Sequence, residues 1–230
     1  MKPVQFLFLS LIVIVFIGCK DEDDDKKAEK FNYGSLNYNG FVYRTIVIGT
    51  QEWTVDNLRT TAYNDGSPIL KVVDGTLWTE NKTGAFCAYS NDEANVTQFG
   101  YLYNWHAVNS GKLAPSTGNW RVPTDADWTK LIDFAGKDSL AGEKLKSETW
   151  PYELVKGKDE FGFNGLPGGF RDAAFVGFFD LIMMSGYYWC STAATEFNAW
   201  VRILRYDKKG IGKAARSFGT GYSVRLVRDR

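Results

Sequence analysis

The sequence predicts an α+β fold class, with two main helices, short twisted antiparallel strands and extensive loops. Two stretches with helical spacing, residues 101–109 and 124–135, precede a succession of short apolar and aromatic runs. Helices and strands that are segregated along the chain, rather than alternating, are typical of α+β domains. The chain also has 23 glycines, and those between the later runs predict turns that separate short strands.

The first structured elements after residue 31 are predicted to be strands. Residues 41–48 (FVYRTIVI) are rich in β-branched and aromatic side chains, and Gly49-Thr50 follows as a turn. Residues 51–58 (QEWTVDNL) predict a second short strand. Residues 61–82 mix Asn, Asp, Gly and Pro with isolated apolar residues, which predicts a loop.

The clearest regular element is a helix at residues 124–135. Pro123 fixes the backbone just before it, and Thr124 and Asp127 have the spacing of a capping box, with Asp in place of Glu. Gly136 predicts its end. Its apolar stripe, at helical spacing, consists of Trp128, Leu131, Ile132 and Ala135.

Weaker patterns predict the remaining elements. Residues 101–109 place Leu102, Trp105 and Val108 at helix-like spacing, which indicates the second main helix. A short helix is expected at residues 139–146. Four apolar or aromatic runs predict strands, at residues 175–179, 188–192, 199–206 and 223–228.

The first eighteen residues have the pattern of a signal peptide. An apolar run at residues 6–17, interrupted only by Ser10, is shorter than the roughly 20 residues of a membrane span. Gly18-Cys19 follows, and the segment resembles the lipobox of bacterial lipoproteins, which usually has Leu where this chain has Phe16. We therefore expect cleavage before Cys19 and a lipid anchor, with diacylglycerol and palmitate, on that cysteine. The alternative, a buried cysteine that ends an N-terminal helix, conflicts with the charged residues 20–25.

Residues 19–32 are predicted to be an acidic, solvated tether for a single domain at residues 33–230. Ala28 is the only apolar residue in the segment 21–30 (DEDDDKKAEK), which therefore has little area to bury. Lys20, Asp21 and Glu22 look like the surface-export signal of Bacteroidota-type lipoproteins. This resemblance implies an outer-membrane, surface-exposed location, whereas the alternative is a polar linker without a sorting role.

Composition limits the partners and leaves two cysteines in the domain. Lys plus Arg and Asp plus Glu balance at 27 each without a basic patch, so nucleic acid is not an expected partner. Hydrophobic residues at 44% are sufficient for a sizeable core. Besides Cys19, the chain has Cys87 and Cys190. An exported compartment permits a disulfide between them, and the alternative is two buried thiols.

A series of motifs recurs in fixed order along the chain. The motifs are residues 86–92 (FCAYSND), 99–105 (FGYLYNW), 119–125 (NWRVPTD), 162–163 (GF), 166–171 (LPGGFR), 189–192 (WCST) and 223–229 (SVRLVRD). The series resembles the Fibrobacter succinogenes major paralogous domain from about Tyr43 to Asp229, and that family occurs in exported and lipoprotein chains. The resemblance implies a C-type-lectin-like fold, similar in outline to the formylglycine-generating sulfatase-modifying domain through residues 120–128 and 221–228.

Two positions depart from that family's pattern. Cys190 stands where the family more often has Trp or Ser, and Leu226 where Cys is frequent. The redox cysteines of the sulfatase-modifying relatives have no counterpart at Cys87 and Cys190, so the oxidative activity is not carried over. The motif tryptophans are expected in the core, because their size lets them dominate packing. They are Trp105, Trp120, Trp128 and Trp189.

The sequence contains few side chains of the kinds that catalysis or metal binding requires. His106 is the only histidine, which rules out a histidine-based metal cluster and favours a packing role for this side chain. Catalytic residues and cofactors are therefore not expected, with calcium as the one cation considered. Asp92 and Asn95 offer oxygens in one loop for calcium, and the alternative is a capped turn.

The sequence favours a non-catalytic binding module for a glycan or a protein. Aromatic residues in loop-like stretches are candidates for stacking on sugar rings, although core packing explains them equally well. A structural component of the envelope and a formylglycine-generating type of enzyme are the alternative hypotheses. The candidate aromatic residues are Trp78, Phe178, Phe179, Tyr187 and Tyr188.

Overall fold

Strands dominate the computed structural model, which describes residues 31–230. They form three sheets. In spatial order, the first sheet consists of β1 (Gly34–Tyr38), β2 (Phe41–Ile48), β3 (Gln51–Thr54) and β12 (Val227–Asp229). The second runs through β11 (Gly212–Ser217), β10 (Asn198–Arg205), β9 (Ser185–Ala193), β7 (Gly168–Arg171) and β8 (Phe179–Ile182). The third runs through β4 (Leu70–Lys71), β5 (Ala85–Cys87) and β6 (Leu102–Tyr103).

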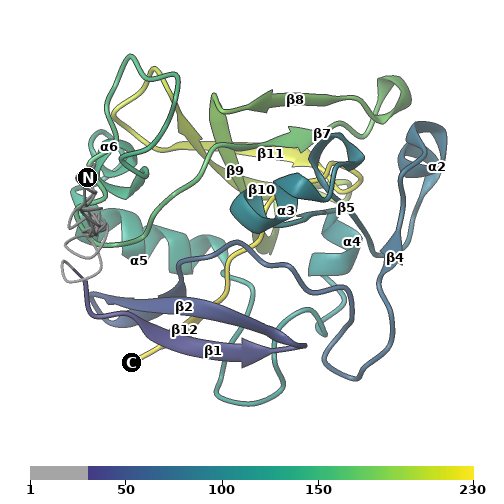
Figure 1. Ribbon diagram of the computed structural model, residues 1–230, viewed down its shortest axis with the longest axis horizontal. Helices are drawn as coiled ribbons and strands as arrows, with labels where there is room; N and C mark the ends of the chain where they lie inside the picture. The colour runs from purple at the N-terminus through teal and green to yellow at the C-terminus, as the bar shows by residue number, and fades with distance from the viewer. Residues whose placement is uncertain (1–30) are drawn as a thin grey trace, which may run out of the picture. The chain divides into compact units, whose positions relative to one another are not determined.

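The helices are short and are interspersed with these strands along the chain (Figure 1). The α-helices are α2 (Gly75–Glu80), α3 (Ala94–Phe99), α4 (Trp105–Val108), α5 (Asp125–Ala135) and α6 (Ala141–Leu145). Two 3₁₀ turns, η1 (Tyr89–Asn91) and η2 (Phe175–Gly177), complete the regular structure of the described chain.

The expected α+β, C-type-lectin-like domain with two main helices is wrong, because the chain is mostly β and 19% helical. Only α5, with 11 residues, is a sizeable helix. The second expected helix, at residues 101–109, is divided between the strand β6 and the short helix α4. Tyr103 pairs with Phe86 in the third sheet and exchanges main-chain hydrogen bonds with Tyr222, so the helix α4 begins only after Asn104, which caps it. Pairing with distant strands thus overrides the local helical spacing.

The predicted helix at residues 124–135 is confirmed as α5. The Thr124 hydroxyl accepts a hydrogen bond from the main-chain N–H of Asp127, and the Asp127 carboxylate accepts one from the main-chain N–H of Thr124. Gly136 ends the helix in the left-handed conformation, with φ of 110°. The predicted stripe is buried, which places α5 against the core.

The other predictions are met to differing degrees. The strand at residues 41–48 is confirmed as β2, whereas the strand predicted at 51–58 ends at Thr54. The prediction of a strand at 175–179 is wrong, because η2 forms there and β8 begins only at Phe179. The loop predicted at 61–82 contains β4 and α2. The remaining predicted segments contain β9, β10, β12 and α6, with shifted bounds.

Aromatic side chains form the core. One cluster gathers around Trp105, Trp120 and Trp189, and a second contains Trp128, as the sequence predicted for all four tryptophans. In the second cluster the rings of Trp53 and Trp128 are 4.9 Å apart between centroids. Burial of this apolar area is the main favourable contribution to folding.

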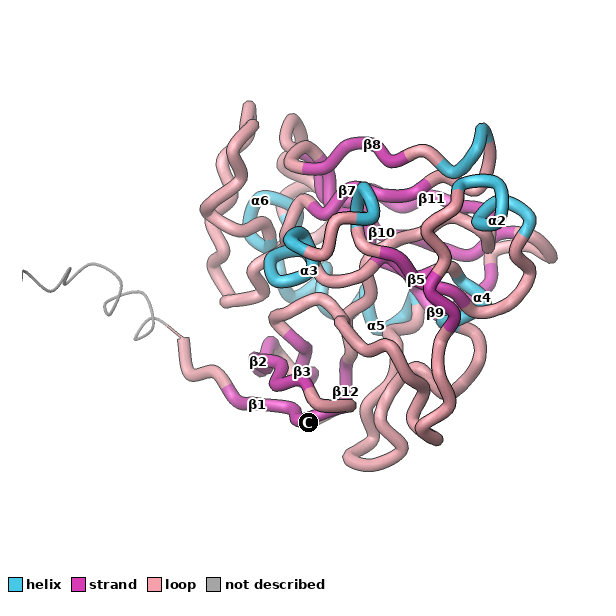
Figure 2. The backbone as a smooth tube through the Cα atoms, turned by 45° about the vertical axis from the view of Figure 1, so that its right-hand side comes forward, coloured by secondary structure: helices cyan, strands magenta, loops and turns pink. Residues whose placement is uncertain are grey.

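The start of the described chain and the helix α2 lie on opposite sides of the domain. The described chain begins beside β1, and both views place the β1 end on the side of the molecule opposite α2 (Figures 1 and 2). The turn η2 packs directly against α2, at that far side. Among the helices of residues 31–230, none has the length and apolar character needed to cross a membrane.

Candidate functional site

The side chain of Arg171, at the end of β7, holds two distant loops together. Its Nε donates to the carbonyl oxygen of Gly177 in η2 at 3.1 Å. Its Nη1 and Nη2 donate to the carbonyl oxygens of Val72 and Val73, just before α2, at 2.6 and 2.9 Å. The guanidinium is buried and lies 4.6 Å from the centroid of the Trp78 ring. One buried cation thereby fixes the start of α2 relative to η2.

The contact between α2 and η2 is close at main-chain level. Asp74 caps α2 by accepting a hydrogen bond from the N–H of Leu77 at 2.8 Å. The carbonyl oxygen of Val176 occupies the space in which a β-carbon on Gly75 would lie, so this position admits only glycine without rearrangement.

Two exposed residues of η2 have a strained backbone. Phe175 and Val176 have φ of 46° and 59°, in the left-handed region that side chains such as valine rarely adopt. Such conformations persist only where the surroundings hold them, and they concentrate at functional positions. Here they hold two apolar side chains in solvent, 82% and 72% exposed.

An apolar pocket of about 410 Å³ lies along α2 and the segment that precedes it, from Leu70 to Asn81. Exposed aliphatic side chains, including Leu77 at 62% exposure, form its walls. We call the exposed apolar residues of the segment from β4 to α2, and of η2 with the residue after it, the apolar corner: Leu70, Val73, Leu77, Phe175, Val176 and Phe178. The other residues around the pocket are Lys71, Val72, Asp74, Glu80 and Asn81.

The charges at the rim of the pocket leave an acidic excess. Lys71 is paired with Glu93 at 2.5 Å, and Tyr101 donates a hydrogen bond to the same carboxylate. These contacts, first Lys71 and then Tyr101, lower the pKa of Glu93. Glu80 is exposed and takes part in none of the ion pairs formed within residues 31–230. Among the residues that line the pocket, the carboxylates of Glu80 and Asp74 are therefore not balanced by a free cation.

The predicted aromatic candidates differ in exposure, because some are at the surface and others are buried. Phe178 is exposed and belongs to the apolar corner. Trp78 is buried beneath α2 against Arg171, and Tyr187 is buried with its ring stacked 5.0 Å from that of Tyr222. Phe179 and Tyr188 are partly and fully buried. The sequence signals for the rest of the corner were the isolated apolar residues of the segment 61–82 and the apolar run at residues 175–179.

The candidate calcium ligands form a hydrogen-bonded turn. Asp92 accepts a hydrogen bond from the main-chain N–H of Ala94 at 3.0 Å, and the Asn95 amide donates to the carbonyl oxygen of Tyr89 at 3.1 Å. Within the described chain, no three His, Cys, Asp or Glu side chains come together as they would to hold a metal ion.

The two cysteines of the domain are buried free thiols. Of the two alternatives that the sequence left open, the structure therefore shows two thiols and not a disulfide. Cys87 lies in the small cluster around Trp78, and Cys190 in the cluster that contains Trp128. Burial raises the pKa of Cys87 to about 11 and that of Cys190 to about 12. His106 is partly buried, with its ring edge-on to Phe218, and burial followed by the charge of Lys82 lowers its pKa.

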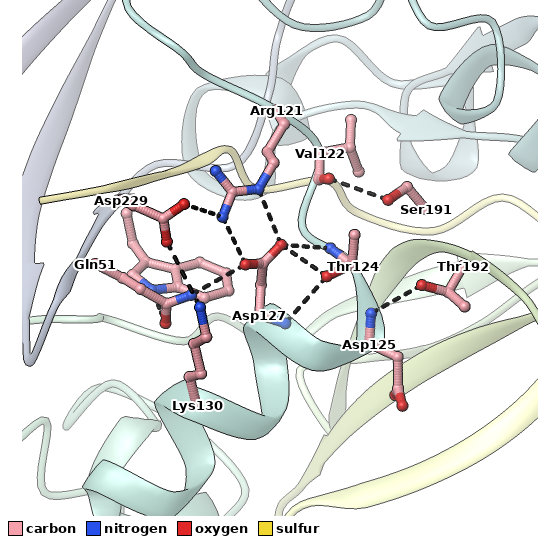
Figure 3. A network of polar contacts seen from close by, with 11 residues as sticks. Gln51, Arg121, Val122, Thr124, Asp125, Asp127, Lys130, Ser191, Thr192 and Asp229 are labelled. Carbon is pink, nitrogen blue, oxygen red and sulfur yellow. Dashed lines mark hydrogen bonds and ion pairs between the residues drawn. The ribbon is translucent and has the colours of Figure 1, made fainter.

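A polar network joins the motif residues around α5 to the first sheet (Figure 3). Asp127 accepts from Arg121 Nη2 at 2.6 Å and Nε at 3.1 Å, and from the amide of Gln51 at 3.2 Å. Arg121 also pairs with Asp229 at 3.0 Å. These contacts fix α5 against β3 and β12, so this part of the motif series serves the scaffold.

Cys19 and the residues Lys20, Asp21 and Glu22 lie outside the described residues. Their predicted roles in lipid attachment and export therefore remain predictions.

The fold and the site define a mostly β domain in which the buried Arg171 fixes two irregular loops and which presents one apolar corner. The model of the Fibrobacter succinogenes major domain matches residues 46–228, and the chain belongs to this family. No curated protein and no solved structure matches the chain.

Proposed function

We propose that this chain is a lipoprotein, anchored through Cys19 at the outer membrane and exposed at the cell surface, whose domain is a non-catalytic binding module. The observation that carries the proposal is the apolar corner. Exposed apolar side chains on two segments that pack together are typical of a partner-binding site, because monomeric proteins rarely expose large apolar patches. Here a buried arginine, a glycine contact and a strained turn all hold the patch in place.

The position of the corner suits display. The described chain begins beside β1, on the side of the domain opposite α2 (Figure 2). A tether that enters at β1 and is fixed to a membrane through Cys19 leaves α2 and η2 free to face outward. The partner is therefore a molecule of the cell surface or its surroundings.

The lining of the pocket favours a protein partner over a glycan. Sugar rings stack on flat aromatic faces, whereas the walls here are the aliphatic side chains of Leu70, Val73 and Leu77. Aliphatic walls fit apolar side chains of a polypeptide, which gain free energy by leaving water.

The thiols favour binding over oxidative catalysis. A cysteine nucleophile reacts as the thiolate, and reactive cysteines have a lowered pKa in a partly exposed site. Cys87 and Cys190 show the opposite, since burial raises the pKa of both.

Site-specific photocrosslinking on intact cells tests the proposal. A photoreactive phenylalanine replaces Leu77 in the corner or, as a matched control, Leu154, which is 79% exposed in another loop. We expect a discrete adduct with an envelope or external protein from position 77 and none from position 154. Adducts from both positions alike, or from neither, would contradict a binding role for the corner.

A further inference from the structure

We infer that the apolar corner binds an extended polypeptide segment in which an apolar side chain lies next to a lysine or arginine. This inference rests on the proposed function and names its ligand class. Three independent features of the pocket support it: its size and walls, an open strand edge, and the sign of its charge.

The pocket has the size of a side-chain site. At about 410 Å³ it lies within the roughly 300–1,000 Å³ range of small ligand sites. Leu70 lines it from β4, Val73 from the loop that follows, and Leu77 from α2. An aliphatic or aromatic side chain inserted there would contact apolar groups from both β4 and α2.

The main chain of β4 offers an edge for an extended segment. In the third sheet β4 pairs with β5 alone, so its other edge has no partner strand among residues 31–230. The N–H of Val72 donates to Phe86 in β5, and successive residues of a strand point their hydrogen-bonding groups to opposite sides. The N–H and C=O of Lys71 therefore face the open edge, beside the pocket. Extended peptides recognise such edges by adding a short strand.

The charge at the rim selects a basic neighbour. Glu93 neutralises Lys71, the only cation among the residues that line the pocket, while the carboxylate of Glu80 has no partner in the described chain. A lysine or arginine near the inserted side chain would pair with Glu80, whereas an acidic residue there would be repelled. Arg171 does not alter this balance, because backbone carbonyls and aromatic rings enclose its charge.

Binding of defined peptides tests the inference. The probes are labelled octapeptides with alternating residues, in three sets: Leu or Val with Arg, Leu or Val with Glu, and Ser with Arg. The full lipoprotein, reconstituted in nanodiscs, is titrated by fluorescence anisotropy at low and high salt. We expect only the apolar–basic set to bind, more weakly at high salt because ions screen the exposed pair.

Two variants separate the contributions of the pocket and the charge. Leu77→Asp should weaken binding of the apolar–basic peptides at least tenfold, whereas Leu154→Asp should leave it unchanged. Glu80→Lys should transfer the preference to the apolar–glutamate set. If no set binds, or if Glu80→Lys leaves the preference unchanged, the inference is wrong. If position 77 forms the photocrosslinked adduct on cells but the protein prefers no peptide set, the inferred ligand class is wrong and the proposed function stands. If position 77 forms no adduct either, the proposed function is wrong as well.

Discussion

The carbonyl oxygen of Val176 fills the space that a side chain at Gly75 would need, so α2 and η2 meet without an intervening side chain. Because η2 adopts left-handed backbone at Phe175 and Val176, its carbonyl can point at the helix while its side chains face solvent. The apolar corner depends on this contact between segments that lie about 100 residues apart in the sequence.

Gly75→Ala should therefore destabilise the domain, although alanine is the better helix former. We expect the clash with Val176 to outweigh the helical gain and lower the free energy of unfolding by about 1–3 kcal/mol. Crosslinking from position 77 should fall together with stability, because η2 must move away from α2. Urea unfolding measures the first effect. Gly212→Ala is the control, since a β-carbon there meets only ordinary contacts; equal losses in both variants would contradict the role of the glycine contact.

Arg171 is one of three buried cations in the described chain that backbone carbonyls surround. Arg225 donates to the carbonyl oxygens of Thr54, Phe163 and Asn164, and Lys146 to those of Val155, Arg205 and Lys208. Loops without a regular ladder leave buried carbonyls that need donors. A cation supplies several donors from one side chain, which accounts for the stability of so much irregular structure.

Arg171→Met should accordingly lower the free energy of unfolding by about 3 kcal/mol or more, because the buried carbonyl oxygens of Val72 and Gly177 lose their side-chain donor, while that of Val73 keeps the Asn91 amide. Arg171→Lys keeps the charge but has a single nitrogen, and its loss should be smaller. Arg44→Met provides the control: that exposed pair with Asp56 is worth at most about 1 kcal/mol. Similar urea midpoints for the Arg171 and Arg44 methionine variants would show that the carbonyl contacts contribute little.

The α5 helix shows what the sequence could predict and what it could not. Its cap, stripe and final glycine lie within a dozen residues, so local chemistry specifies the element. Tyr103 joins a strand rather than a helix because Tyr222, more than one hundred residues away, pairs with it. The corner was hidden for the same reason, since its two halves meet through Arg171 and through the contact of Gly75 with Val176, which join segments about 100 residues apart. Contacts of that range leave no pattern in a single sequence.

Asp127 should make the stability of the domain depend on pH below neutrality. Burial raises its pKa, but hydrogen bonds from Arg121 and Thr124 outweigh burial and hold the pKa below its ordinary value of 3.8. The unfolded chain therefore takes up the proton first as the pH falls. The stabilisation is complete above the ordinary pKa and is lost as the pH falls toward the folded value.

Asp127→Asn should lower the free energy of unfolding by about 2 kcal/mol at pH 7, where the carboxylate is ionised, because the substitution ends the ion pair with Arg121. The difference between the variant and the natural protein should shrink at pH 3. Urea unfolding at both pH values measures it, and Asp207→Asn, at an exposed ion pair, serves as the control. A difference that stays constant between pH 7 and pH 3 would exclude the ionised carboxylate as its source.

Cys87 and Cys190 should resist alkylation in the folded protein. Their raised pKa values leave little thiolate at pH 8, and both side chains are buried. Mass spectrometry after iodoacetamide treatment should show no adduct on either residue in the native state. Both should react fully in urea without a reducing agent, because they are free thiols. A pair that reacts in urea only after reduction would reveal a disulfide instead.

The lipid anchor can be tested independently of the domain. Cys19→Ala removes the only thiol predicted to accept lipid, so labelling with an alkyne analogue of palmitate should disappear and the chain should no longer fractionate with membranes.

Replacing Lys20, Asp21 and Glu22 by alanine should preserve labelling, since the thiol remains, while surface exposure falls. Protease added to intact cells measures that exposure: the natural chain should be cleaved and the triple variant protected. If the variant is cleaved as readily as the natural chain, the three residues act only as a polar linker. Residues 31–230 form a compact unit of their own, so equal urea unfolding of all three proteins is the expected control.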